Sequence, residues 1–175
     1  MNSRQLLPQV LNFFVFIILQ IVVVRNLVLF DTAFCYVYVA FILLLPIELG
    51  VVTAMLLGFV SGLLVDAFYN TLGIHAAASV FIMFIRPRWL QFLTPRGGYD
   101  ISAVPTPQAL GLRWFAAYAL PMLLIHHALI FLIEAADLQL LGFSLAKTFA
   151  SAIFTLLMIV IIQYILSSSS RRTVL

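Results

Sequence analysis

A single carboxylate interrupts a long apolar stretch near the middle of the chain. Between Glu48 and Arg86 the one formally charged residue is Asp66, in the stretch MLLGFVSGLLVDAFYNTLGIHAAASVF. An ionised carboxylate in hydrocarbon costs roughly 2.5–3.5 kcal/mol on insertion scales, so Asp66 requires a pairing group or water. Gly58, Gly62 and Asp66 follow one another at intervals of four and share one helix face, where the glycines allow another helix to approach closely. The pattern predicts contact with another segment, in this chain or in a partner.

Two roles stay open for Asp66. It lies a few residues before the turn Tyr69-Asn70-Thr71-Leu72-Gly73, so it could be partly solvated or cap the next helix, or it could contact a partner. Gly73 is expected to shape the turn, and His75 could bond Asp66 across it. The residues predicted to serve helix packing or partner contact are Gly58, Ser61, Gly62, Asp66, Gly73 and His75.

Catalytic chemistry finds little support in the sequence. An intramembrane serine protease of the rhomboid type carries Gly-x-Ser-Gly, and Phe59 stands where the first glycine before Ser61 would be, so Ser61 is interpreted as a small residue at a helix contact. Adjacent His126 and His127 diverge by about 100° on a helix and do not easily share one metal ion. We predict no catalytic residue, no metal ligand, no cofactor and no nucleotide-binding loop.

Composition places the chain among membrane proteins. Hydrophobic residues make up 65% of its 175 residues and charged residues 9%, whereas soluble domains have about 45–50% and about 25%. The formal charge of +3 gives no indication of nucleic-acid binding, and the single Cys35 excludes an intrachain disulfide. We expect one all-α transmembrane domain over residues 1–175.

Stretches of sufficient apolar length predict six membrane spans. Each span needs about 20 residues, and the second and fourth are short enough to be tilted or re-entrant. The predicted spans are 10–30, 34–45, 51–68, 74–92, 112–133 and 143–166.

The basic residues predict the orientation. With six spans and a cytoplasmic N-terminus, seven arginines fall on the cytoplasmic side, and Arg25 and Lys147 fall outside, as the positive-inside rule expects. Both termini are therefore predicted to be cytoplasmic. Residues 86–112 are expected to form a cytoplasmic loop, because proline and glycine are frequent there, and the tail SSSSRR is expected to be unstructured. The seven arginines are Arg4, Arg86, Arg88, Arg96, Arg113, Arg171 and Arg172.

The six spans, the length and the stretch GFVSGLLVDAFYNTLGIHA together resemble MreD, the rod shape-determining membrane protein family of bacteria. The residues that carry the match are Gly58, Gly62, Leu63, Asp66, Gly73 and His75. The loop at 94–107 looks longer than is usual for the family.

The resemblance implies a six-helix bundle similar to the substrate-binding subunits of energy-coupling-factor transporters. It implies a non-enzymatic scaffold of the inner membrane that binds the single-span periplasmic protein MreC. Through MreC, such a scaffold helps to link actin-like MreB filaments to a glycosyltransferase and a class B penicillin-binding transpeptidase of peptidoglycan synthesis, and so to regulate cell shape.

Two other functions stay open. A vitamin-binding subunit of a transporter would use His126, His127, Glu134 and Gln163 to hold a polar ligand. An enzyme acting on lipid would have only the scattered acids Asp31, Glu134 and Asp137 near one interface.

Overall fold

The structure is a computed structural model that describes residues 3–100, 103–135 and 138–172. The described chain is mainly helical. Four of its helical stretches are long and apolar enough to cross a membrane, which identifies a helical membrane protein. These stretches are Leu7–Asn26, α3 (Val51–Tyr69), α6 (Leu112–Ala135) and Leu141–Leu166 of α7 (Leu141–Arg172).

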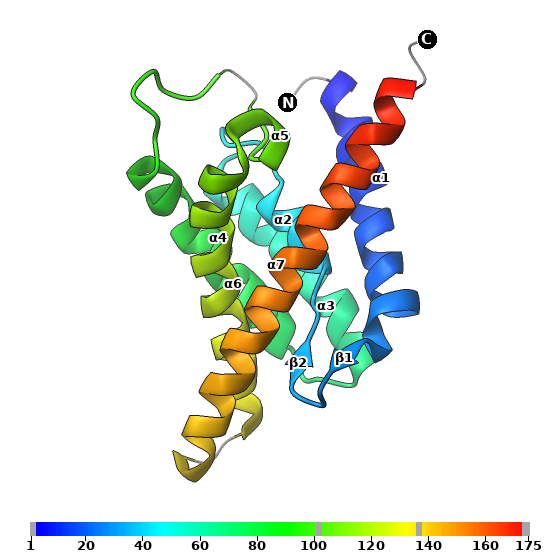
Figure 1. The fold of residues 1–175 in the computed structure, drawn as a ribbon, viewed down its shortest axis with the longest axis vertical. Helices are drawn as coiled ribbons and strands as arrows, with labels where there is room; N and C mark the ends of the chain where they lie inside the picture. The colour runs from blue at the N-terminus through cyan, green and yellow to red at the C-terminus, as the bar shows by residue number, and fades with distance from the viewer. Residues whose placement is uncertain (1–2, 101–102, 136–137, 173–175) are drawn as a thin grey trace.

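The helices run roughly along the long axis of the molecule (Figure 1). The start of α1 (Ser3–Ile18) and the end of α7 lie at one end, and the hairpin of β1 (Val28–Leu29) and β2 (Ala33–Phe34) lies toward the other. In the hairpin Val28 pairs with Phe34 and Leu29 with Ala33, in antiparallel register.

The first predicted span, 10–30, ends earlier than the hydropathy indicates. After α1 the chain passes through one π-helical stretch, Leu19–Val23, and one 3₁₀ turn, Val24–Asn26, before it enters the hairpin. Apolar side chains alone do not distinguish the end of a helix from the start of a strand, because both elements can be apolar.

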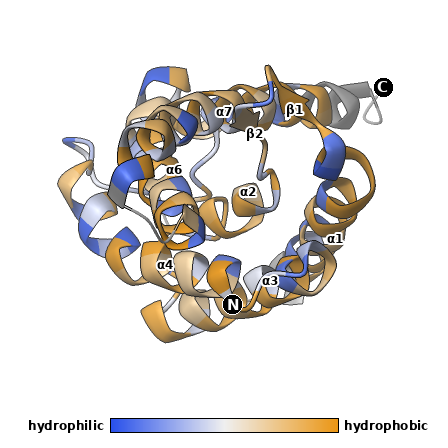
Figure 2. Ribbon diagram, turned by 90° about the horizontal axis from the view of Figure 1, so that it is seen from below, coloured by the Kyte–Doolittle hydropathy of each residue, from blue (hydrophilic) through white to orange (hydrophobic). Residues whose placement is uncertain are grey.

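The predicted span 34–45 is not one continuous helix. This stretch consists of the end of β2, three residues without regular structure, the six-residue helix α2 (Tyr38–Leu43) and the first two residues of the turn that follows it. Its side chains from Cys35 to Leu45 are nearly all buried, and α2 lies inside the ring of longer helices when the molecule is viewed from below (Figure 2). A non-helical backbone is tolerated at membrane depth only where protein surrounds it, and here protein does.

The long connection starts later than predicted. Helix α4 (Ile74–Phe92) passes through Pro87, so residues 86–92 are helical and are not part of a loop. Residues on both sides of Pro87 bond Tyr118 of α6 (Leu112–Ala135). Arg86, which is buried, donates to its hydroxyl, and Trp89 Nε1 donates to its carbonyl at 3.2 Å. The connection that follows contains the single turn α5 (Pro107–Leu110), which Thr106 caps through the Ala109 N–H.

One tyrosine anchors the connection to the end of α4. The hydroxyl of Tyr99 donates to the Leu90 carbonyl at 2.7 Å, and its ring meets Trp114 edge-on. Burial raises the pKa of Tyr99 above its ordinary value, so the phenol remains a hydrogen-bond donor at neutral pH.

The polar tail also differs from its prediction. Helix α7 continues through the four serines to Arg172 instead of ending before them. Extending an existing helix by one residue is far easier than starting a new one, so a short serine run need not end it.

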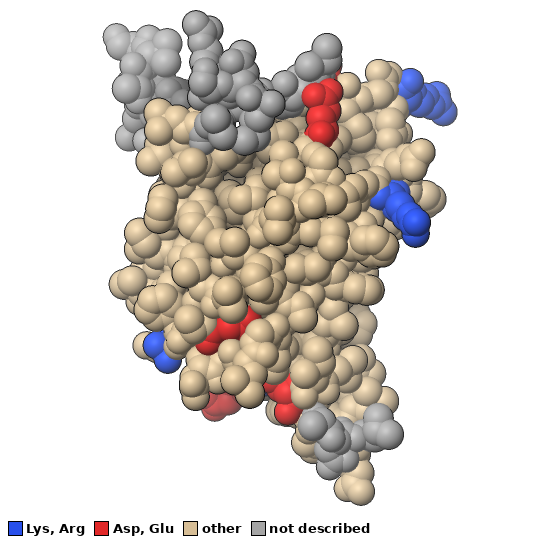
Figure 3. Space-filling model, turned by 180° about the vertical axis from the view of Figure 1, so that it is seen from behind, with Lys and Arg blue, Asp and Glu red and all other residues tan. Residues whose placement is uncertain are grey.

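Charged side chains are unevenly spread over the surface. On the face opposite to that of Figure 1 they lie in the upper and lower parts of the molecule, with an uncharged band between them (Figure 3). Large apolar side chains on α1, α3 and α7 point outward, as a lipid-facing surface requires. Examples are Phe14, Leu56, Phe59 and Leu157.

Candidate functional site

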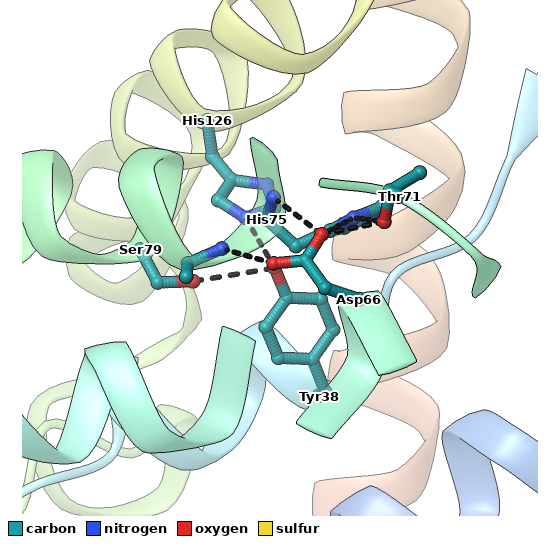
Figure 4. A network of polar contacts seen from close by, with 7 residues as sticks. Tyr38, Asp66, Thr71, His75, Ser79 and His126 are labelled. Atoms are coloured by element: carbon teal, nitrogen blue, oxygen red, sulfur yellow. Dashed lines mark hydrogen bonds and ion pairs between the residues drawn. The ribbon is translucent and has the colours of Figure 1, made fainter. Parts of the chain in front are cut away.

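Asp66 caps the start of α4. Its carboxylate accepts the backbone N–H of His75 at 3.1 Å and that of Ala76 at 2.9 Å, and the Thr71 hydroxyl also donates to it. The first N–H groups of a helix have no partner within that helix, and the N-terminal end of the helix dipole favours a negative charge. With 3% of its surface exposed, Asp66 is satisfied by protein and not by bulk water (Figure 4).

The turn between α3 and α4 owes its shape to two left-handed residues. Asn70 ends α3 at φ +57°, and Gly73 precedes α4 at φ +83°. A Cβ built on Gly73 would meet nothing within 4 Å, so glycine is required there by the backbone conformation and not by space. This turn brings Asp66 and the start of α4 together.

His75 completes the cap. Its Nδ1 lies 3.1 Å from Asp66 Oδ1 and 3.2 Å from the Thr71 hydroxyl. Since a carboxylate only accepts hydrogen bonds, Nδ1 carries the proton that is shared with it. The ring meets that of Tyr36 edge-on at a centroid distance of 5.0 Å, and Nε2 is buried without a described partner.

The glycines of α3 form the seam with α4. A Cβ on Gly62 would lie 2.4 Å from Ala76 Cα, and a Cβ on Gly58 would lie 3.1 Å from the Ser79 carbonyl oxygen. Backbone atoms cannot move aside as a flexible side chain would, so Gly62 fixes how closely the helices approach. Ser61 is buried and donates to the Leu57 carbonyl one turn before it, at 2.6 Å.

The six residues predicted for packing or partner contact therefore lie in one unit of this chain. Gly58 and Gly62 contact α4, Asp66 and His75 bond across the turn, Gly73 shapes the turn, and Ser61 is buried within α3. Of the two roles left open for Asp66, the structure shows the helix cap.

A second polar cluster lies next to the cap (Figure 4). The Tyr38 hydroxyl lies 2.7 Å from His126 Nε2 and 3.2 Å from the Ser79 hydroxyl. All three side chains are fully buried, and they come from α2, α6 and α4. The tyrosine thereby connects the inner helix to the two helices beside it.

Polar side chains also bind the backbone of the non-helical segment. The Ser151 and Thr155 hydroxyls of α7 accept the N–H groups of Phe34 at 2.9 Å and Tyr36 at 3.1 Å. Gln20 donates to the Cys35 carbonyl at 3.2 Å. Its side-chain oxygen also accepts the Tyr38 N–H at 3.3 Å, and its nitrogen lies 2.6 Å from the Tyr69 hydroxyl. An unpaired peptide group would cost several kcal/mol at this depth.

Arg86 binds the other end of the same segment. It is 1% exposed, its Nε donates to the Tyr118 hydroxyl at 2.7 Å, and its Nη atoms donate to the Leu45 and Pro46 carbonyls. Tyr118 in turn donates to the Leu43 carbonyl at 2.9 Å. Tyr118 therefore binds the last carbonyl of α2, and Arg86 binds two carbonyls of the turn that follows this helix.

The assignment of Arg86 to a cytoplasmic loop is therefore wrong. Arginine between two apolar stretches usually marks a loop, but this one is a buried group of the bundle. Gln20, Tyr38, Arg86, Ser151 and Thr155 were not predicted as site residues. The sequence signal that could have drawn attention to them is a polar residue inside an apolar span, which is costly without a partner.

The other residues considered for a ligand site or a lipid enzyme bind different parts of the protein. His127 bonds the Leu123 carbonyl at 2.7 Å and the Thr155 hydroxyl at 3.2 Å. Glu134 lies 3.9 Å from Lys147, whose ammonium also lies 4.3 Å from the centroids of the Phe34 and Phe131 rings. Asp31 is exposed in the hairpin turn, and Asp137 lies outside the described residues.

The contacts of these clusters within the described residues are hydrogen bonds to other groups of the protein. In the described part of the chain, no group of three or more His, Cys, Asp and Glu side chains could hold a metal ion. The carboxylate of Asp66 and the guanidinium of Arg86 each bind groups of the fold itself.

Comparison with known proteins finds no matching protein-family model, no matching curated protein and no matching solved structure.

Proposed function

We propose that this chain is a non-enzymatic scaffold of the bacterial inner membrane that serves cell elongation, as its resemblance to MreD implies. The observation that supports the proposal is the α3–α4 hairpin, in which five of the six residues that carry the resemblance act together. Gly62 sets the distance between the helices, and Asp66 caps α4. A motif used to hold a rigid hairpin is compatible with a scaffold, whose task is to present a fixed surface.

The proposed partner is an MreC-like single-span protein, and its contact uses a face other than the glycine face. Helix α4 already covers Gly58 and Gly62. The outward side of α3, with Leu56, Phe59 and Leu63, remains free within the described chain. Through that partner, the proposed complex is linked to MreB filaments, to the glycosyltransferase and to the class B transpeptidase.

We further propose six crossings of the membrane with both termini cytoplasmic. Four crossings are the long apolar helices, and the other two are α4 and the segment from β2 to α2. The common end shared by the start of α1 and the end of α7 supports an even number of crossings (Figure 1).

Replacement of Asp66 in the host tests the function. Cells whose sole copy carries Asp66→Leu are expected to lose rod shape, and less of the MreC-like protein should co-purify in mild detergent. Asp31→Asn serves as the matched control, because Asp31 is exposed and distant in sequence from the cap. Normal rod growth with Asp66→Leu, at a membrane level equal to that of the wild type, would contradict the proposal.

Depletion of the chain separates this function from the transporter alternative. A scaffold predicts rounded cells after depletion, and no vitamin in the denatured purified protein by mass spectrometry. Rod-shaped cells after depletion would contradict the scaffold function. A stoichiometric bound vitamin would favour a binding subunit of a transporter.

A further inference from the structure

An apolar groove opens on the side of the molecule between α1, α2 and α3. Its volume is about 280 Å³. One polar residue, Gln9, stands among its lining residues, and it lies in the first two turns of α1. The lining residues are Gln9, Val10, Phe13, Phe41, Leu45, Leu49, Leu57 and Val60.

The size of the groove restricts what it can hold. Apolar cavities of about 150 Å³ stay dry and take up a molecule the size of benzene. The groove is nearly twice as large, so it accommodates a short length of hydrocarbon. An α-helix with its side chains is about 10–12 Å wide. Even one turn of such a helix takes up more space than the groove provides.

The position of the groove makes it continuous with the lipid-facing surface. It lies between two stretches that are long and apolar enough to span a membrane, Leu7–Asn26 and Val51–Tyr69. Val10 and Val60 line the groove and are also exposed on the outer surface, next to exposed Leu11 and Phe59. Lipid tails that cover these helices therefore reach the mouth of the groove directly.

We propose that this groove binds one acyl chain of a membrane lipid, drawn from the leaflet that faces the start of α1. The Gln9 end lies toward the headgroups, where the amide can bond an ester or a phosphate. The tail passes between Phe13 and Leu57 toward Phe41. This site goes beyond the scaffold function and does not depend on it.

Photolabelling with a lipid tests the site. The purified protein is placed in vesicles of phosphatidylethanolamine and phosphatidylglycerol that contain a phosphatidylcholine with a diazirine in its acyl chain. Illumination followed by peptide mapping is expected to find adducts on Phe41 and Leu45. These side chains are 3% and 1% exposed, so lipid on the outer surface reaches them only through the groove.

Two matched substitutions on α3 separate the groove from the surface. Val60→Trp fills the mouth and is expected to lower labelling of Phe41 and Leu45 about tenfold, which corresponds to ~1.4 kcal/mol of binding free energy. Leu56→Trp adds the same side chain at an exposed position outside the groove and should leave that labelling unchanged. If Val60→Trp does not fold, Val10→Trp fills the groove from α1, with Leu11→Trp as its control.

Three outcomes would overturn the site. The first is labelling of Phe59 on the outer surface without labelling of Phe41 or Leu45. The second is equal labelling of Phe41 in Val60→Trp and Leu56→Trp. The third is the absence of lipid labelling together with release of a co-purifying protein by Val60→Trp, because the groove would then hold a protein side chain. Loss of the scaffold function alone would leave the labelling pattern intact.

Discussion

The α3–α4 hairpin and the buried segment from Phe34 to Pro46 meet the same requirement in opposite ways. Both contain backbone groups that lie away from water and need hydrogen-bond partners. In the hairpin, the partners of Asp66 lie 5, 9 and 10 residues further along the chain. In the buried segment, the partners of Tyr36 and Leu45 lie 119 and 41 residues away.

The structure of the hairpin is therefore determined by residues close to it in the sequence, and that of the buried segment by residues far from it. The hairpin depends on a short motif that can be interpreted without knowledge of the rest of the fold. The segment depends on side chains from four other parts of the chain, so it holds its shape only when the bundle is assembled. Substitutions in the two regions test whether their stabilities differ in this way.

Removal of Arg86 is expected to have the largest effect. Arg86→Ala leaves the Leu45 and Pro46 carbonyls and the Tyr118 hydroxyl without their shared partner. Each such buried group costs about 1–3 kcal/mol, so the free energy of unfolding should fall by about 4 kcal/mol. Equilibrium unfolding in mixed detergent micelles measures this change. Arg88→Ala, at an exposed position of the same helix, should have little effect, and equal losses for the two variants would contradict the role of Arg86.

Enlargement of Gly62 is expected to have the next largest effect. Gly62→Leu forces α3 and α4 apart, because even a Cβ would lie 2.4 Å from a backbone atom of Ala76. Overpacking of this kind costs about 3 kcal/mol. Gly58→Ala should cost less, and Gly142→Ala serves as the control because its Cβ meets nothing within 4 Å. If thermal unfolding gave Gly142→Ala and Gly62→Leu the same loss of unfolding temperature, α3 and α4 would not be closely packed at Gly62.

Loss of the helix cap is expected to cost about 2 kcal/mol. Asp66→Ala removes the acceptor of two backbone N–H groups and of the Thr71 hydroxyl. Asp66→Asn keeps one oxygen and should fall between the wild type and the alanine variant. Hydrogen exchange of the His75 and Ala76 amides provides the specific measurement. Unchanged exchange of these two amides in Asp66→Ala would refute the cap.

The smallest effect is expected from a single hydroxyl that serves the buried segment. Thr155→Val removes the hydroxyl that accepts the Tyr36 N–H and that also lies 3.2 Å from His127 Nε2, and it should cost about 1 kcal/mol. Thr148→Val is the matched control, because the buried Thr148 hydroxyl donates only within α7, to the Ser144 carbonyl. Indistinguishable unfolding of the two valine variants would show that α7 does not support the segment through this bond.

The sequence by itself determined the class of protein and the local hairpin. Its apolar composition requires a membrane, and the spacing of Gly58, Gly62 and Asp66 places them on one helix face. The cap by Asp66 was one of two roles that the sequence left open, since a carboxylate a few residues before a turn lies within reach of the next helix.

Only the tertiary structure decided the form of the segment after the first helix and the role of Arg86. Phe34–Leu45 is apolar enough for a helix, and hydropathy does not reveal that Gln20, Ser151 and Thr155 bind its backbone. In the sequence, Arg86 resembles a loop residue. The tertiary structure shows that it is buried and binds Tyr118 and the Leu45 carbonyl. The physical reason is that peptide groups must be paired in hydrocarbon, and the side chains that pair them lie far away along the chain.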